Sequence, residues 1–110
     1  MLPRSAVFVA MLLSAVVAAS ADDSLPFTCR AERVQLEINM RQSEERIDAA
    51  WLAEDPVKKC IAVRQHTEVM RNAIAVYTRC LRGKEREEKR SMALDRVADF
   101  EALADELFCP

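Results

Sequence analysis

Two cysteines within one sharply delimited segment constrain the fold of this chain more than any other feature. The segment runs from Asp55 to Gly83, and Cys60 and Cys80 lie near its two ends. Aspartate is a good helix N-cap, the proline that follows Asp55 fits the first helical position, and glycine readily takes the left-handed conformation that ends a helix. The pattern therefore predicts one continuous helix over residues 56–82.

Apolar residues recur on this helix at spacings of three and four. They form two neighbouring stripes, which predicts that the helix packs against two partners. One stripe contains Cys60, Val63, Thr67, Met70, Ile74, Tyr77 and Leu81, and the other contains Ala62, Val69, Ala73, Val76 and Cys80.

Two further helices are expected, over residues 28–53 and 85–108. Both stretches lack internal glycine and proline and are rich in strong helix formers. Alternating residues from Val34 to Met40 also fit a half-buried strand, but no second alternating run exists to pair with it. The charged run 84–90 fits either the first turns of the last helix or a loop that ends at an N-cap, Ser91.

The cysteine spacing selects one pairing among the three that four cysteines allow. In a continuous helix Cys60 and Cys80 lie about 30 Å apart, too far for a disulfide. Residues bridged across a helical hairpin should be equidistant from its turn. Cys29 with Cys80 is centred on the first predicted turn and Cys60 with Cys109 on the second, whereas the remaining pairings are centred inside helices or join opposite ends.

The fold expected is therefore all-α: an up-down-up three-helix bundle, stapled by two interhelical disulfides, Cys29 with Cys80 and Cys60 with Cys109. Each closes a loop of about 50 residues, worth about 4 kcal/mol in the chain-entropy model. The aromatic residues Phe27, Tyr77, Trp51 and Phe108 lie near the predicted disulfides and are expected to pack over them.

Residues 1–21 are expected to be a cleaved signal peptide. Arg4 precedes an apolar run over residues 6–17, and Ala19-Ser20-Ala21 supplies small residues for cleavage. The apolar stretch is about 15 residues, short of the roughly 20 that span a bilayer. The single domain would then be residues 22–110. It contains all four cysteines, which in a short exported chain predict disulfides. The expected location is the periplasm of a bacterium, or otherwise the extracellular space.

Neither the charge nor the motifs point to catalysis or to nucleic acid. The formal net charge of −2 is mildly acidic, which argues against a surface that binds nucleic acid. His66 is the single histidine and cannot build a multi-histidine metal site. The favoured interpretation is a histidine that lies on the surface or has hydrogen-bond partners for its ring nitrogens. No catalytic, cofactor-binding or metal-binding residue is expected. Acidic pairs at helical spacing, Asp95 with Asp99 and Glu101 with Asp105, are better explained as solvated faces.

The function expected is protein–protein interaction without catalysis, as an inhibitor, chaperone or accessory subunit. The acidic back of the last helix and the charged run 84–90 are candidate surfaces for a basic partner. Self-association is a further possibility, since an amphipathic face can complete its burial against a second copy. The alternative function is a carrier of a small hydrophobic ligand between helices, with Met40, Met70 and Met92 as an adaptable lining.

Overall fold

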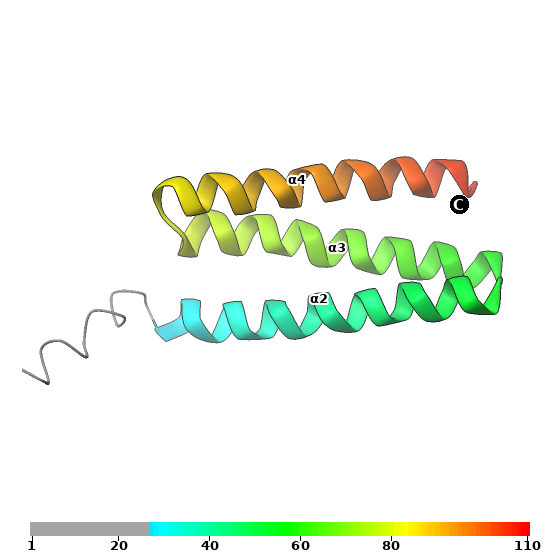
Figure 1. The fold of residues 1–110 in the computed structure, drawn as a ribbon, viewed down its shortest axis with the longest axis horizontal. Helices are drawn as coiled ribbons and strands as arrows, with labels where there is room; N and C mark the ends of the chain where they lie inside the picture. Colours follow the sequence, from blue (N-terminus) through cyan, green and yellow to red (C-terminus); the bar gives the residue numbers. More distant parts are fainter. Residues whose placement is uncertain (1–26) are drawn as a thin grey trace, which may run out of the picture.

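The computed structural model describes residues 27–110, and the predicted signal peptide lies outside the described residues. It contains three helices, α2 (Phe27–Ala53), α3 (Pro56–Cys80) and α4 (Gly83–Glu106), and these three run alternately up and down (Figure 1). The all-α, up-down-up prediction is confirmed. Residues 34–40, whose alternation also fitted a strand, lie within α2.

The turn between α2 and α3 follows the predicted capping chemistry. The Asp55 side chain accepts hydrogen bonds from the backbone N–H groups of Val57 at 2.9 Å and of Lys58 at 3.4 Å. Pro56 occupies the start of the helix, where its missing N–H costs no intrahelical bond. Glu54 takes the left-handed conformation, with a φ of 53°, and so reverses the chain in a very short connection.

The turn between α3 and α4 differs from the prediction. α3 ends at Cys80 rather than at residue 82, and its C-cap is Leu81 in an extended conformation. Gly83 does take a left-handed φ of 59°, but it opens α4 instead of ending α3. The charged run 84–90 is helical, so the loop alternative for this run is wrong.

Both predicted disulfides are present, each with its two Cα atoms 5.5 Å apart. The first joins Cys29 in α2 to Cys80, the last residue of α3. The second joins Cys60 in α3 to Cys109, which lies just beyond the end of α4. The second bridge therefore holds the segment after α4, rather than α4 itself, against α3.

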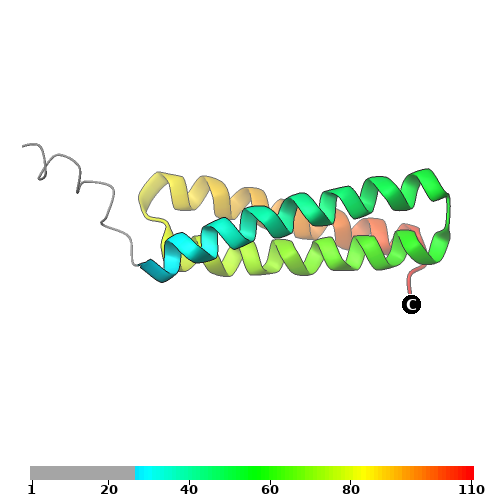
Figure 2. The ribbon, with the colours of Figure 1, turned by 90° about the horizontal axis from the view of Figure 1, so that it is seen from below.

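α3 is the central element, and α2 and α4 pack on either side of it (Figures 1 and 2). Between α2 and α4 the structure shows side-chain contact, such as Arg33 with Glu85 at 3.8 Å, without close approach of the backbones. The main core lies around the Cys29–Cys80 disulfide. It consists of Cys29, Leu36, Met70, Ala73, Val76, Tyr77, Cys80, Leu81 and Ala93.

The aromatic residues divide between the core and the surface. Tyr77 is 7% exposed and packs in the core with Cys29 and Cys80, as predicted. Phe108 is 92% exposed, so the prediction that it would cover the second disulfide is wrong. Trp51 is 37% exposed, and its packing over that disulfide stays a prediction. The Phe27 side chain lies outside the described part of the structure.

Candidate functional site

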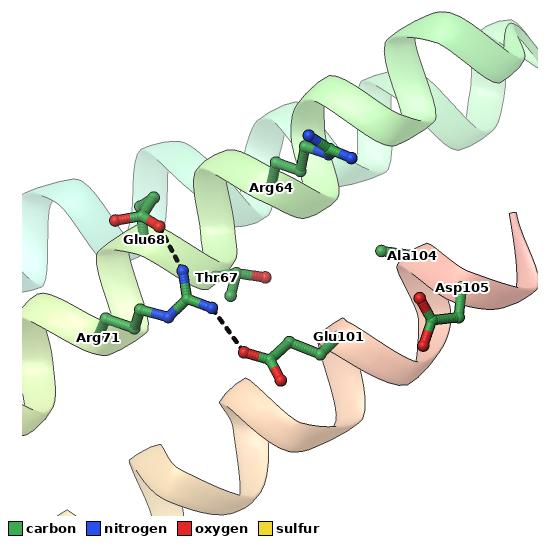
Figure 3. Close-up of a pocket in the computed structure, with 7 residues that line it drawn as sticks. All are labelled: Arg64, Thr67, Glu68, Arg71, Glu101, Ala104 and Asp105. Atoms are coloured by element: carbon green, nitrogen blue, oxygen red, sulfur yellow. Dashed lines mark hydrogen bonds and ion pairs between the residues drawn. The ribbon is translucent and has the colours of Figure 1, made fainter. Parts of the chain in front are cut away.

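A charged groove runs between α3 and α4 (Figure 3). Arg71 of α3 lies at its centre and donates hydrogen bonds to Glu68 of its own helix and to Glu101 of α4, both at 2.5 Å. The bonds to Glu101 and then to Glu68 raise the pKa of Arg71 above its usual range. Arg64 and Asp105 also line the groove, but neither makes an ion pair within residues 27–110.

The charged side chains of this groove are exposed to solvent. The side chains of Arg71, Glu68 and Glu101 are all half or more exposed. Exposed ion pairs of this kind contribute about 0–1 kcal/mol each and are screened by salt. The predicted acidic pair Glu101 and Asp105 therefore has one member tied to an arginine, and it does not form a paired acid–base site.

An apolar surface surrounds the second disulfide at the other end of α3, and we call it the Phe108 surface. It encloses a hollow of 360 Å³. Its lining residues come from the start of α3 and from the segment at and beyond the end of α4: Pro56, Val57, Cys60, Ile61, Arg64, Leu107, Phe108 and Pro110. Val57 is 67% exposed and Ile61 is 52% exposed, so large apolar side chains face solvent across this surface.

The backbone conformation of Phe108 is fixed by hydrogen bonds and by the neighbouring disulfide. Its φ of 54° is left-handed, and its N–H bonds the carbonyl of Asp105 at 3.1 Å. The next residue, Cys109, donates its N–H to the carbonyl of Ala104 at 3.0 Å and is bridged to Cys60. The backbone that carries the Phe108 ring is therefore held in one conformation by two hydrogen bonds and the adjacent disulfide.

A second apolar hollow, the α2/α3 groove, lies on the other flank of α3. Its volume is 250 Å³, and its residues are Arg46, Ala49, Ala50, Lys58, Ile61, Ala62 and Gln65. The floor is made of small side chains, since Ala50 and Ala62 are 4% and 3% exposed. Ile61 lines both this groove and the Phe108 surface, so the two hollows meet along the exposed edge of α3.

His66 is fully buried, at the contact of all three helices. Its Nδ1 lies 2.8 Å from the Ser43 hydroxyl, which in turn donates to the Met40 carbonyl at 3.0 Å, and its ring lies 4.5 Å from that of Phe100. Since the Ser43 proton is used on Met40, Nδ1 carries the proton and donates it to Ser43. Nε2 has no hydrogen-bond partner within residues 27–110.

The environment of His66 disfavours its charged form. Burial first, and then the positive charge of Arg96, lowers the pKa of His66, while Glu44 opposes the shift. A pocket of 350 Å³ adjoins the ring and is lined by Glu44, Ile47, Asp48, Arg96 and Phe100 besides His66. The prediction that the ring nitrogens have hydrogen-bond partners is therefore confirmed for Nδ1 and wrong for Nε2 within residues 27–110.

Within residues 27–110, one group of possible metal ligands converges. It comprises Cys29, Glu32 and Cys80. The two sulfurs are bonded to each other, so neither is a thiolate that could coordinate an ion. Glu32 is instead paired with Arg79 at 2.6 Å. This group is explained by the disulfide and its neighbouring ion pair.

The other residues singled out from the sequence are dispersed over the fold. Met70 is fully buried in the core, Met40 packs against that core, and Met92 is 39% exposed, so these three methionines do not line one cavity. Asp95 and Asp99 are exposed on α4 and make no ion pair within residues 27–110.

The three helices of residues 27–110 each lack the combination of length and apolarity that crossing a bilayer requires. The two disulfides are compatible with an exported protein. Comparisons with protein-family models, with curated proteins and with solved structures found no match to this chain.

Proposed function

We propose that this chain is an exported protein that acts by binding a protein partner through the Phe108 surface, without catalysing a reaction. The observation that carries the proposal is the 92% exposure of Phe108 on a backbone fixed by a disulfide. Its location is the periplasm if the source is bacterial, and otherwise the extracellular space. The two disulfides and the signal-like residues 1–21 support this location.

The placement of apolar residues supports an interaction role. Small domains have few apolar side chains to spare from their own core. Here Val57, Ile61 and Phe108 lie together on the outside, beside the half-buried Leu107. Contiguous exposed apolar surface of this kind marks interaction sites, and rigid aromatic side chains are frequent anchors of protein interfaces.

The fixed backbone of Phe108 lowers the cost of binding. Fixing the backbone of one mobile residue on binding costs roughly 1–2 kcal/mol. The Cys60–Cys109 bridge and the hydrogen bond from the Phe108 N–H restrict the backbone before any partner arrives. The charged groove between α3 and α4 borders the same surface through Arg64 and supplies a polar rim.

Site-specific photo-crosslinking tests this proposal. A benzophenone amino acid replaces Phe108 in one variant, and Leu94, which is 48% exposed on α4, in a matched variant. Illumination in the compartment where the protein accumulates should give a discrete crosslinked protein species from position 108 at several times the yield from position 94. Equal yields from the two positions would contradict the proposal.

A further inference from the structure

We propose that the hollow beside His66, which we call the His66 pocket, binds a free amino acid with a cationic side chain, of the lysine class. This inference does not depend on the Phe108 surface. Three features of the described residues support it: a pocket of suitable size between α2 and α4, a buried ring nitrogen without a hydrogen-bond partner, and a set of charges that the protein leaves unpaired.

The His66 pocket lies between the two outer helices. Its volume is 350 Å³, within the range of about 300–1,000 Å³ that is usual for small-molecule sites. All three helices contribute to its lining: Glu44, Ile47 and Asp48 from α2, His66 from α3, and Arg96 and Phe100 from α4. In the part of the chain that the structure describes, the backbones of α2 and α4 do not approach each other closely. A small molecule can therefore lie between them.

His66 offers the pocket a hydrogen-bond acceptor that the protein does not use. The ring is fully buried, and its Nδ1–H is held by the Ser43 hydroxyl at 2.8 Å. Nε2 therefore keeps its lone pair, and it has no hydrogen-bond partner within residues 27–110. A ligand N–H that donates to Nε2 satisfies a polar atom that has already been removed from water. The exposed side chains of Glu44 and Arg96 change rotamer within nanoseconds and can admit the ligand.

The charges of the pocket are not paired within the protein. Glu44 and Asp48 are four residues apart on α2, so their carboxylates lie on one helical face, and Arg96 lines the pocket from α4. None of the three makes an ion pair within residues 27–110. In the charged groove, by contrast, Arg71 is bonded to both of its acidic neighbours. The His66 pocket therefore presents two anions and one cation to a ligand.

A basic amino acid has the charges that complement this set. It carries two cationic groups for the two carboxylates of α2 and one carboxylate for the guanidinium of Arg96. One of its ammonium N–H groups can donate to Nε2 of His66, and its aliphatic chain can pack on the half-buried Ile47 and Phe100. A diamine would leave Arg96 unpaired, and a phosphate ion would be repelled by both acidic side chains.

The ring nitrogens of His66 provide a direct readout, because this histidine is the only one in the chain. In protein labelled with ¹⁵N-histidine, a hydrogen bond to the lone pair of Nε2 moves the Nε2 resonance upfield. Titration of the disulfide-bonded protein with L-lysine at neutral pH should give a saturable shift of this kind. L-norleucine lacks the side-chain ammonium group and cadaverine lacks the carboxylate. Each should bind about ten- to a hundredfold more weakly, the loss expected for one charged hydrogen bond. An Nε2 resonance that does not move up to high millimolar lysine would overturn the inference.

Two variants on α4 separate the site from a general effect of charge. Arg96→Gln removes the guanidinium from the pocket, and Arg90→Gln removes another exposed arginine that does not line it. Arg96→Gln should weaken lysine binding about ten- to a hundredfold and should not weaken cadaverine binding. Arg90→Gln should leave both affinities within about threefold, because distant exposed charges are screened by salt. Circular dichroism checks that both variants keep the fold. Equal affinities of the two variants for lysine would contradict the pairing of its carboxylate with Arg96.

Discussion

Lowering the pH from about 7.5 to about 5.5 should destabilise this protein through His66. The ring is fully buried, its Nδ1–H is held by Ser43, and its Nε2 has no partner within residues 27–110. A second proton on Nε2 would place a positive charge beside Phe100 with no acceptor for the new N–H. The charged groups that face the ring are Glu44 and Asp48 from α2 and Arg96 from α4.

The sign and size of the effect follow from proton linkage. Burial and Arg96 lower the pKa of His66 in the folded state from its ordinary value of 6.5. As the pH falls, the unfolded chain therefore binds the proton first, so the free energy of unfolding decreases below about pH 6.5 and levels off below the folded pKa. Between pH 7.5 and 5.5 this single group can remove at most about 1.4 kcal/mol.

Urea unfolding followed by circular dichroism, repeated across this pH window, measures the effect. His66→Gln is the matched control, because glutamine keeps a side-chain amide near Ser43 and does not titrate. Carboxylates titrate mainly below this window, so they contribute little to either curve. Wild type should lose up to about 1.4 kcal/mol more than the variant between the two pH values. Parallel curves would refute the conclusion that a neutral imidazole is buried here.

Three further outcomes are expected from the stability of variants, each measured by urea unfolding. Replacing Cys29 and Cys80 together by alanine should cost more than removing the other disulfide. The two bridges close loops of similar length, each worth about 4 kcal/mol, but only the first is buried in the main core, where its sulfurs also pack against apolar side chains. Equal losses of unfolding free energy would argue against a contribution from this packing. Asp55→Ala should cost about 1 kcal/mol and Asp55→Asn much less, because asparagine can still accept hydrogen bonds from the first turn of α3. Gly83→Ala should cost about 1–2 kcal/mol. The cost comes from the left-handed φ alone, because an added Cβ would meet no atom within 4 Å. An unchanged urea midpoint of unfolding would show that the backbone of this turn relaxes.

The disulfide pairing could be predicted because helix geometry leaves few possibilities. A continuous helix separates Cys60 from Cys80, and the hairpin midpoints match the cysteine pairs to the turns that Asp55 and Gly83 mark. Both pairs form in the structure. The register of the helices could therefore be predicted from the residues that form the two turns and from the positions of the four cysteines in the sequence. The exact ends of α3 did not, because extended linker residues and a frayed last turn look alike in sequence.

The candidate sites were harder to predict because they depend on how the helices meet. The sequence favoured a histidine that is either on the surface or hydrogen-bonded in the core, because a single histidine cannot build a multi-histidine metal site. The structure buries His66 on α3 between Val63 and Met70. Phe108 is next to Cys109 in the sequence, which predicted that its ring would pack over the second disulfide. Its left-handed backbone, which turns the chain after α4 so that Cys109 reaches Cys60, leaves the ring outside. Neither orientation is encoded in residue spacing.

The pattern of the two disulfides also has a mechanical consequence. For tension applied at residues 29 and 109, the shortest covalent path runs from Cys29 to Cys80, back along α3 to Cys60, and out through Cys109. The backbone through α2 and the backbone through α4 join the same two disulfides by longer paths, so both remain slack when the shortest path is fully extended. Even if α3 unravelled, only about 20 residues would lengthen, to about 70 Å, whereas the unbridged chain could extend to about 270 Å. The two disulfides therefore limit the extension of residues 29–109 to the extended length of the segment between Cys60 and Cys80, even when all three helices unravel.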